Sequence, residues 1–307
     1  VGGGADVLIT IDLPEFSLRL AKSVRRMKQV PSVHYVAPTV WAWRPGRARK
    51  MAPFVDHVLA LFPFEPPYMQ AAGMSCEFVG HPVVNDRRAT RCDAQRFRAE
   101  TGIDEAPIIL CLPGSRDSEI KRLAPVFGKV VEKLNATRPE LRFVLPMAAP
   151  VVNLVKDQIS TWPVMPVLIE PSLDAQTDSL KRAAFQAADV ALAASGTVSL
   201  ELAATQTPMV IAYDMGLLSR QIIGRMLQVE TVSLVNLITN SKTIPEFIGE
   251  HCREEMITPS VLKVLDDPMR QIDAMQIAMQ ALGQGGHPPG ERAAQSVITF
   301  LAKHKHY

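Results

Sequence analysis

The sequence predicts an α/β fold made of two Rossmann-like domains, each with a parallel sheet, that face a cleft. Short apolar runs alternate with longer helical segments along the chain, as in parallel sheets covered on both faces. Two of these runs end in turns that open helices, at Leu112 to Arg116 and at Ser195 to Thr197. With 307 residues, 47% of them hydrophobic, the chain also exceeds the usual size of a single domain.

The apolar runs give the expected strands in chain order. In the first half they are Val7 to Ile11, Val33 to Val36 and Val55 to Leu61. Further along the chain they are Ile108 to Leu112, Leu141 to Leu145, Val167 to Ile169, Val190 to Ala193 and Met209 to Tyr213. An Arg-rich polar segment follows Gly80-His81-Pro82, so we place the domain linker within Gly80 to Arg98.

Two helices that follow the expected linker are predicted in more detail. One follows Leu112, because an apolar stripe recurs at helical spacing, and Asp117 or Ser118 is expected to cap its start. The stripe comprises Ile120, Leu123, Phe127, Val130 and Leu134. Near the other end, the glycines and prolines of Gly283 to Gly290 predict a loop, and a last helix is expected over about Glu291 to Ala302.

Composition narrows the function classes. Lys and Arg number 33 against 31 Asp and Glu, a formal charge of +2, so no overall field favours nucleic acid. The four cysteines are scattered without metal-ligand spacing, which fits a reducing compartment. No apolar run approaches the roughly 20 residues of a membrane span, and no signal peptide is recognisable. A cytosolic location is therefore expected.

The turn Leu112 to Arg116 is a candidate anion site. The N–H groups that open a helix lack intrahelical partners, and the helix dipole adds positive charge there. Arg116 supplies a planar guanidinium suited to a diphosphate, with Gly114 and Ser115 in the turn. A nucleotide-activated substrate fits such a site, although a plain turn with a solvated arginine is an equally good reading of this segment alone.

A second turn of the same kind favours the ligand reading. Ser195, Gly196 and Thr197 follow an apolar strand and precede a helix, the place where open α/β sheets bind ligands. Glu201 lies about one turn inside this helix, where its carboxylate could accept hydrogen bonds from ribose hydroxyls. A capping box would need Ser or Thr three residues before Glu201, and Val198 stands there instead.

The first domain offers several candidate groups. Asp12 and Glu15 follow the first strand, where a carboxylate could act as a general base, although an acidic pair that complements a helix dipole explains them equally simply. His81 is a further candidate for the cleft. The segment His34 to Arg44, which includes Trp43, joins aromatic and basic residues and suits an anionic amphiphile or core packing.

Met215 to Leu227 combines apolar residues with arginines. Such a face could lie on anionic lipid or hold acyl chains, and ordinary core packing is the simpler interpretation. The residues concerned are Leu217, Leu218, Arg220, Ile222, Ile223, Arg225, Met226 and Leu227.

Together these segments resemble the lipid-A-disaccharide synthases, glycosyltransferases of the GT-B type. The resemblance covers nearly the whole chain. It rests on Ile11 to Phe16, His34 to Arg44, Phe62 to Glu65, Gly80 to Pro82, Leu112 to Arg116, Ser195 to Thr197 with Glu201, and Ser233 to Asn236. On this basis we expect residues 1–87 to form a partial acceptor domain joined by the C-terminal helix 291–307. Residues 88–290 would form the domain that binds the UDP-sugar.

The resemblance implies an inverting, metal-independent transfer that needs no cofactor. A 2,3-diacylglucosamine unit would pass from its UDP donor to 2,3-diacylglucosamine 1-phosphate, giving a β-1,6-linked disaccharide and UDP. The family's candidate base falls at Glu15, with Asp12 and His81 as alternatives, and Arg116 would stabilise the departing diphosphate.

The resemblance further implies which residues contact the substrates. Besides Arg116, the implied substrate-binding residues are Gly114, Ser115, Ser195, Gly196, Thr197, Glu201, Tyr213, Asn236, His81 and Trp43. Glu15 stands where the family usually has Asp, and Ser17 where it has Asn; Val235 replaces a customary Pro, and Asp214 a basic residue.

The resemblance also implies a setting and a partner. We expect a peripheral protein on the cytoplasmic face of the inner membrane, in a homodimer, with no nucleic-acid partner. The family's opening strand and glycine-rich loop have no counterpart here, so an incomplete first domain is expected, with an exposed sheet edge. Two alternatives stay open: another GT-B enzyme that uses UDP-N-acetylglucosamine, or a chain that binds UDP without catalysis.

Overall fold

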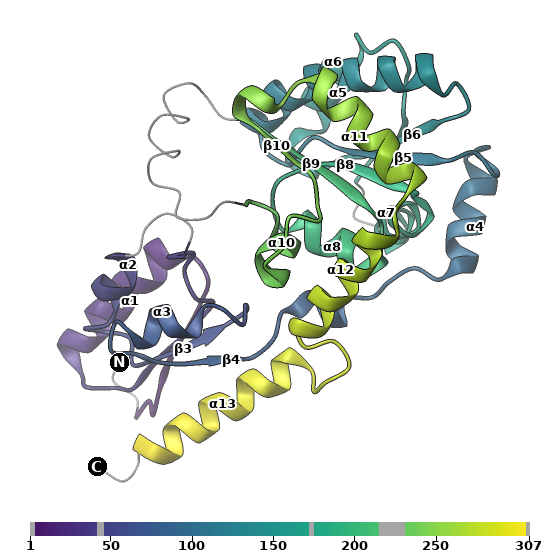
Figure 1. Cartoon of the computed structure of the whole chain (residues 1–307). Helices are drawn as coiled ribbons and strands as arrows, with labels where there is room; N and C mark the ends of the chain where they lie inside the picture. Colours follow the sequence, from purple (N-terminus) through teal and green to yellow (C-terminus); the bar gives the residue numbers. More distant parts are fainter. Residues whose placement is uncertain (1–3, 42–45, 172–174, 215–230, 305–307) are drawn as a thin grey trace. The chain divides into compact units, whose positions relative to one another are not determined.

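The computed structural model describes residues 4–41, 46–171, 175–214 and 231–304. Within them the chain forms two compact units (Figure 1). The first holds the residues up to Asp86 together with those from Met279 onward, and the second holds Arg87 to Ala278. The predicted α/β fold with two parallel sheets is confirmed.

The first unit contains a four-stranded parallel sheet in the order β1-β2-β3-β4. Its strands are β1 (Leu8–Ile11), β2 (Ser32–Tyr35), β3 (His57–Ala60) and β4 (Ser75–Phe78). Its helices are α1 (Pro14–Met27), α2 (Gly46–Met51), α3 (Pro66–Gln70), the 3₁₀ turn η1 (Pro82–Asn85) and α13 (Pro289–His304). The core between sheet and helices is apolar, with Met51, Val58 and Met69 fully buried.

The last helix, α13, packs on this first sheet. His57 on β3 contacts the Ser296 hydroxyl of α13 at 2.9 Å and stacks on Phe300. Arg292 donates to the carbonyl of Phe78 at the end of β4. A segment more than two hundred residues away in the sequence thus completes the first unit.

One boundary prediction is wrong at this helix. The segment Gly283 to Gly290 was expected to be a loop throughout, yet α13 begins at Pro289. Proline is well tolerated in the first turn of a helix, because its missing N–H has no intrahelical acceptor there and its φ is already helical.

The second unit is a doubly wound domain. Its six parallel strands run in the order β10-β9-β8-β5-β6-β7. They are β5 (Ile108–Leu112), β6 (Arg142–Pro146), β7 (Val167–Ile169), β8 (Val190–Ala194), β9 (Met209–Tyr213) and β10 (Glu246–Ile248). Predicted and observed strands agree within two residues at each end. Strand β10 was not predicted, because it has only three residues and begins with Glu246.

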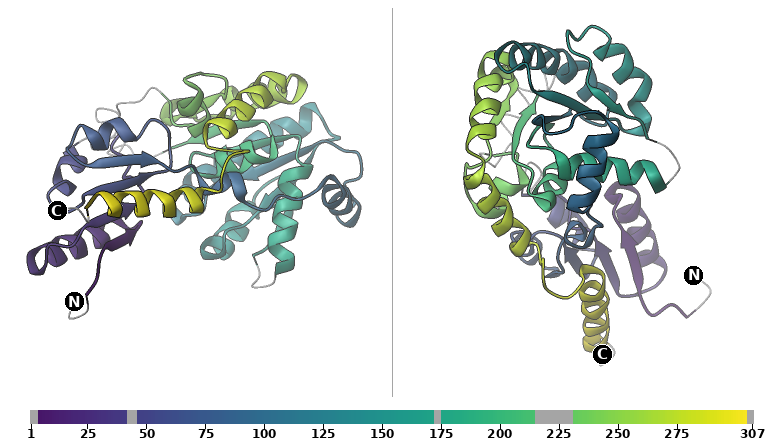
Figure 2. Two further views of the ribbon diagram at one scale, coloured as in Figure 1. Left: turned by 90° about the horizontal axis from the view of Figure 1, so that it is seen from below. Right: turned by 90° about the vertical axis from the view of Figure 1, so that its right-hand side faces the viewer.

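Helices cover both faces of the second sheet (Figure 2). One face carries α5 (Asp117–Thr137), α6 (Val152–Ile159) and α11 (Glu254–Asp266). The other carries α7 (Ala175–Ala187) and α8 (Val198–Thr205), with α4 (Arg91–Glu100) against α7 and α10 (Leu234–Thr239) against α8. The remaining elements are η2 (Ala149–Val151), η3 (Gly249–His251) and α12 (Met269–Ala281). The predicted apolar stripe of α5 is confirmed, since all five of its residues are fully buried.

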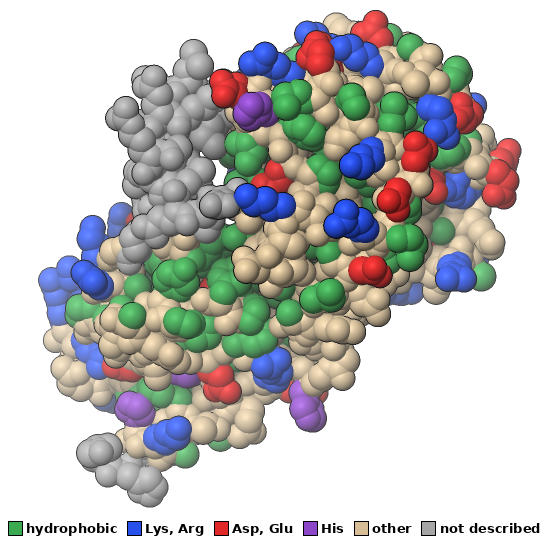
Figure 3. Space-filling model, in the orientation of Figure 1, with side chains coloured by type: hydrophobic (Ala, Val, Ile, Leu, Met, Phe, Trp, Pro, Cys, Tyr) green, Lys and Arg blue, Asp and Glu red, His purple; other side chains and the backbone are tan. Residues whose placement is uncertain are grey.

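The surface mixes charges of both signs. On the face that Figure 3 shows, blue and red side chains alternate over the second unit rather than gathering in one field. Within the described residues, no helix combines the length and apolar character that crossing a membrane requires.

Candidate functional site

Strand order creates a crevice in the second unit. The order reverses between β5 and β8, which pair directly, with Leu112 opposite Ala193. Chains leaving the carboxyl ends of two such strands turn away to opposite faces and leave room between them, so ligands bind there in open α/β sheets. Both predicted turns leave from these two strands.

A cavity of about 400 Å³ lies at this point. Most of its lining comes from the two turns and the helices that follow them: Leu112, Gly114, Ser115, Arg116, Glu119, Ala194, Ser195, Gly196, Thr197, Val198 and Glu201. The end of β6 and the segment after it add Pro146, Met147 and Ala148, and α7 adds Lys181 and Phe185. The volume lies within the range of small-molecule sites. The structure therefore brings together seven of the predicted site residues.

The first turn is closed by a carboxylate. Glu119 Oε2 accepts hydrogen bonds from the backbone N–H groups of Ser115 at 2.9 Å and Arg116 at 3.3 Å. Glu119 Oε1 accepts one from Arg116 Nη1 at 3.0 Å. The expected cap at Asp117 or Ser118 is wrong, because Arg116 occupies the cap position and Glu119, three residues later, supplies the acceptor.

The second turn is open by comparison. Gly196 has a φ of +156°, and its carbonyl accepts from the Ser199 hydroxyl at 2.8 Å. The Ser195 hydroxyl donates to the carbonyl of Val232 at 3.3 Å. In the described part of the chain, the backbone N–H groups of Thr197 and Val198 donate no hydrogen bond to another backbone group. These two groups suit an anionic ligand.

A second cation lies in the wall of the cavity. Lys181 Nζ on α7 is 2.8 Å from Glu201 Oε2 and 5.2 Å from the centre of the Phe185 ring. The sequence analysis missed Lys181, since only the packing of α7 beside α8 brings it to the turn. The sequence did offer one indication of Lys181: it stands four residues before Phe185, so the two side chains share one face of the helix. Among the described residues, no group of three or more His, Cys, Asp and Glu side chains could hold a metal ion.

Two predicted substrate contacts of the second unit lie outside the lining of this cavity. Asn236 is buried, and its amide donates to the Ile244 carbonyl and to Glu246 Oε1, both at 2.8 Å. Glu246 also accepts from the backbone N–H groups of Val232 and Ser233. Asn236 and Glu246 thus hold the segment that contacts the second turn. Tyr213 ends β9 at the same edge of the sheet.

In the first unit, the turn between β1 and α1 has an unusual backbone. Asp12 and Leu13 have φ values of +49° and +43°, a region that residues other than glycine rarely adopt. The Ser17 hydroxyl holds the turn by donating to the Asp12 carbonyl at 2.7 Å. Such strain is typical of functional sites. Glu15, in the first turn of α1, forms an ion pair with Arg47 and is otherwise exposed.

Two histidines of the first unit are held neutral by their surroundings. His81 Nδ1 accepts a hydrogen bond from the backbone N–H of Val83 at 3.1 Å. Burial lowers the pKa of its imidazole, and the negative charge of Asp86 partly opposes this shift. His34 is fully buried, with Nδ1 at 2.8 Å from the Thr10 hydroxyl, and burial lowers its pKa as well.

Trp43 and the segment 215–227, both named in the sequence analysis, lie outside the described residues.

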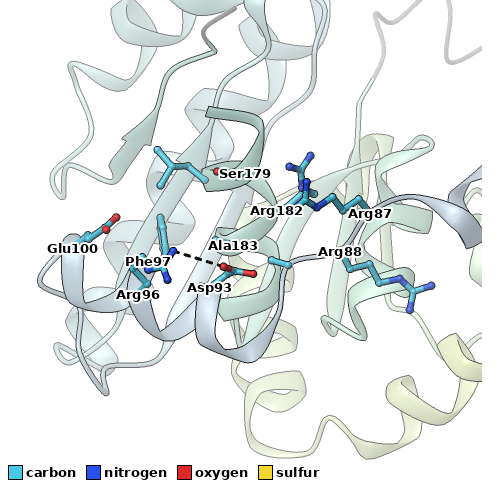
Figure 4. Close-up of a pocket in the computed structure, with 11 residues that line it drawn as sticks. Arg87, Arg88, Asp93, Arg96, Phe97, Glu100, Ser179, Arg182 and Ala183 are labelled. Atoms are coloured by element: carbon cyan, nitrogen blue, oxygen red, sulfur yellow. Dashed lines mark ion pairs between the residues drawn. The ribbon is translucent and has the colours of Figure 1, made fainter. Parts of the chain in front are cut away.

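A second cavity, of about 240 Å³, lies on the other side of α7 (Figure 4). Its lining includes Arg87, Arg96 and Arg182 together with Asp93, which forms an ion pair with Arg96. The carboxylate of Asp93 also accepts from Thr90 in the capping box of α4. Both cavities contain charges of both signs, but the larger one joins both strand-to-helix turns and is the better candidate for a phosphorylated ligand.

Sequence comparison places the chain in a family. The model of the lipid-A-disaccharide synthetase family matches residues 3–297. The chain belongs to this family. A curated lipid-A-disaccharide synthase from Ruegeria pomeroyi is 53% identical over 298 residues, covering 96% of this chain and 74% of that protein. One from Rhodospirillum centenum is 43% identical over 303 residues, covering 97% of this chain and 74% of that protein. The family resemblance predicted from the sequence is confirmed.

Comparison with solved structures supports the GT-B fold. The UDP-GlcNAc 2-epimerase from Neisseria meningitidis, bound to UDP-GlcNAc, matches with a TM-score of 0.62 at 12% identity, covering 96% of this chain and 76% of that one. A putative UDP-N-acetylglucosamine 2-epimerase from Listeria monocytogenes gives the same TM-score at 13% identity, covering 96% and 75%. At such identities the likeness concerns the fold alone.

Proposed function

We propose that this chain is an inverting glycosyltransferase of lipid A assembly. It transfers 2,3-diacylglucosamine from its UDP donor to 2,3-diacylglucosamine 1-phosphate and releases UDP. Family membership and the curated names of the relatives support the class of reaction. The observation that carries the proposal is the cavity at the switch point, where two helix starts and two cationic side chains surround a space of suitable size.

The donor's diphosphate lies between the two turns in this proposal. As the glycosidic bond to UDP breaks, negative charge grows on the leaving phosphate and must be stabilised. Arg116 and Lys181 supply positive charge, and the N–H groups of Thr197 and Val198 supply donors at the start of α8. Gly114, Ser115, Ser195 and Gly196 shape the turns around the phosphates.

The nucleoside end of the donor is assigned to Glu201. One oxygen of its carboxylate pairs with Lys181, and the other can accept from a ribose hydroxyl. Asn236 acts by holding residues 232 and 233 against the second turn, through Glu246, and Tyr213, the last residue of β9, is assigned to the donor as a further contact. Trp43 and His81 are assigned to the acceptor side.

The acceptor's 6-hydroxyl must lose a proton as it attacks the anomeric carbon from the face opposite the diphosphate. Glu15 is the first choice for the base, because it is exposed and in the first turn of α1, next to the strained pair Asp12 and Leu13. Its ion pair with Arg47 orients the carboxylate. Asp12 is the second choice. His81 is the third, since its Nδ1 already accepts a backbone hydrogen bond.

The proposed setting follows from the substrates. Both carry acyl chains, so the enzyme works as a peripheral protein on the cytoplasmic face of the membrane. A homodimer is part of the same proposal, and so is the division into an acceptor domain over residues 1–87, joined by helix 291–307, and a donor domain over 88–290.

Two measurements on one preparation test the proposal. Formation of disaccharide from radiolabelled UDP-diacylglucosamine is followed with 2,3-diacylglucosamine 1-phosphate as acceptor, and UDP binding is measured by titration calorimetry. We expect both product and binding. Binding without product favours a chain that only holds UDP. Activity on non-acylated UDP-N-acetylglucosamine identifies another enzyme of the same fold.

A further inference from the structure

Glu119 fills the place that a ligand was expected to occupy. It lies in the first turn of α5 and is 9% exposed, and its two oxygens accept three hydrogen bonds from the turn before it. Two of those donors, the N–H groups of Ser115 and Arg116, are among the groups that would otherwise bind a phosphate. The protein therefore supplies its own anion at the first turn.

The fit between this carboxylate and the turn is tight. Gly114 has a φ of +119°, and a Cβ atom there would lie 2.5 Å from Glu119 Oε2 and 2.6 Å from Glu119 Cβ. Any larger residue at position 114 would push the carboxylate out. The Glu119 side chain is only 11% exposed, whereas that of Arg116 is 79% exposed. The carboxylate is thus anchored beneath the turn while the guanidinium extends outward.

This arrangement leaves Arg116 available and restrained at once. A guanidinium has five N–H donors in a rigid plane, and Glu119 accepts from Nη1 alone. The remaining donors can face a diphosphate, and the fixed orientation removes part of the entropy cost of aligning them.

The charge of Glu119 has a second effect. Its carboxylate belongs to the wall of the same cavity, so it repels a bound diphosphate. Released UDP carries one more negative charge than the diphosphate diester of the donor, and the repulsion is therefore larger for product than for substrate. A carboxylate here favours departure of the product.

We infer that Glu119 is a positioning residue of the donor site, which aligns Arg116 for the transfer and weakens the binding of the UDP product. The inference rests on the proposed function, because it assumes that the diphosphate binds at Arg116. It differs from a plain helix cap, since a cap needs only an acceptor for the backbone N–H groups, and the amide oxygen of a glutamine supplies one.

The Glu119→Gln variant separates these roles. Glutamine keeps an acceptor for Ser115 and Arg116 but removes the charge and turns an N–H group toward the guanidinium. We expect UDP to bind ~3-fold more tightly at low salt, because a repulsive charge is gone. We expect kcat to fall ~10-fold, because Arg116 loses its restraint and UDP leaves more slowly. Glu132→Gln, at an exposed position of the same helix, should change neither quantity.

Three results would overturn the inference. If Glu119→Gln weakens UDP binding and turnover together and lowers the melting temperature, the carboxylate holds the shape of the turn and does not align Arg116 for the transfer. If the variant matches the parent in both quantities, its charge has no role. If Arg116→Ala and Glu119→Gln both leave UDP affinity unchanged, the diphosphate does not bind at this turn. UDP titration does not depend on transfer, so it tests Glu119 even where no disaccharide forms and the proposed function fails.

Discussion

Arg116 is the residue on which the proposed leaving-group chemistry depends most. Replacing it with Ala removes the one side chain of the first turn that can place positive charge on the departing phosphate, so turnover should fall about a hundredfold or more. Initial rates of disaccharide formation measure the effect. Arg122→Ala serves as the control, because it removes an exposed arginine from α5, the helix that begins directly after Arg116. Near-normal rates in Arg116→Ala would contradict the assignment.

Glu15 is tested by the change that alters charge with the least change of shape. Glu15→Gln cannot accept the proton of the acceptor hydroxyl, so transfer should fall by roughly 10²- to 10⁴-fold. UDP affinity should stay the same, because Glu15 belongs to the first unit while the proposed donor cavity belongs to the second. If turnover survives, Asp12→Asn and His81→Gln are compared next, and the variant that loses turnover identifies the base.

Glu65 gives the first unit a pH-dependent stability. Its carboxyl is almost fully buried, and burial raises its pKa from 4.5 to about 7, although the N–H groups of Phe62, Trp41 and Leu61 oppose the shift. The folded state therefore holds this proton more tightly than the unfolded chain does, and the free energy of unfolding should decrease as the pH rises from 4.5 to 7. A shift of this size corresponds to about 3 kcal/mol.

Denaturant unfolding at pH 5 and pH 8, followed by tryptophan fluorescence, checks the effect of Glu65. Trp41 Nε1 lies 3.3 Å from Glu65 Oε1, so part of this signal comes from a tryptophan beside the carboxyl, and Trp162 adds a signal from the second unit. In Glu65→Gln the difference between the two pH values should shrink by most of that amount. Glu100→Gln, at an exposed position, should retain it. An equal pH dependence in both variants would assign the effect to another group.

At the scale of elements, a polar network around Ser296 contributes to the docking of α13. The Ser296 hydroxyl contacts His57 Nε2 at 2.9 Å and donates to Glu77 Oε2 at 2.5 Å. Ser296→Ala leaves the buried His57 without this partner, which should cost about 1–3 kcal/mol. Hydrogen exchange of the α13 amides should speed up accordingly, while Ser23→Ala, at an exposed serine of α1, should leave it unchanged. Unchanged exchange in Ser296→Ala would show that the other contacts of α13, among them the Arg292 bond to the Phe78 carbonyl, are enough to hold the helix.

Elements were predictable from the sequence where a local pattern encodes them. The strand Ile108–Leu112 and the buried stripe of α5 follow from period and composition, because each fills one layer of a parallel sheet domain. The carboxylate at the first turn was missed, although Glu119 stands three residues after Arg116, because the analysis looked for a cap at Ser118 or Asp117. Lys181 and Glu246 were missed because packing between distant segments brings them to the site.

At the scale of the whole molecule, the proposal to be tested is association with a membrane surface. The sequence proposes Leu217, Leu218 and Ile222 as lipid-facing residues, and they lie outside the described part of the chain. A second apolar surface is visible on α1, where Phe16 is 67% exposed and Leu20 is 40% exposed. Exposed apolar side chains beside basic ones suit an anionic lipid surface. Three basic residues of α1 are exposed: Arg19, Lys22 and Arg26.

Liposome flotation decides between the two surfaces. With vesicles containing anionic lipid, changing Leu217, Leu218 and Ile222 together to Ser should lower the floated fraction several-fold, because each apolar side chain adds insertion energy. Changing Phe16 and Leu20 to Ser should have a smaller effect, since the acyl-chain surface is proposed at 215–227. The reverse order would move the membrane contact to α1. High salt should weaken binding in either case, because the arginines act through screened charge. Parent protein that stays at the bottom of the gradient would refute peripheral association altogether.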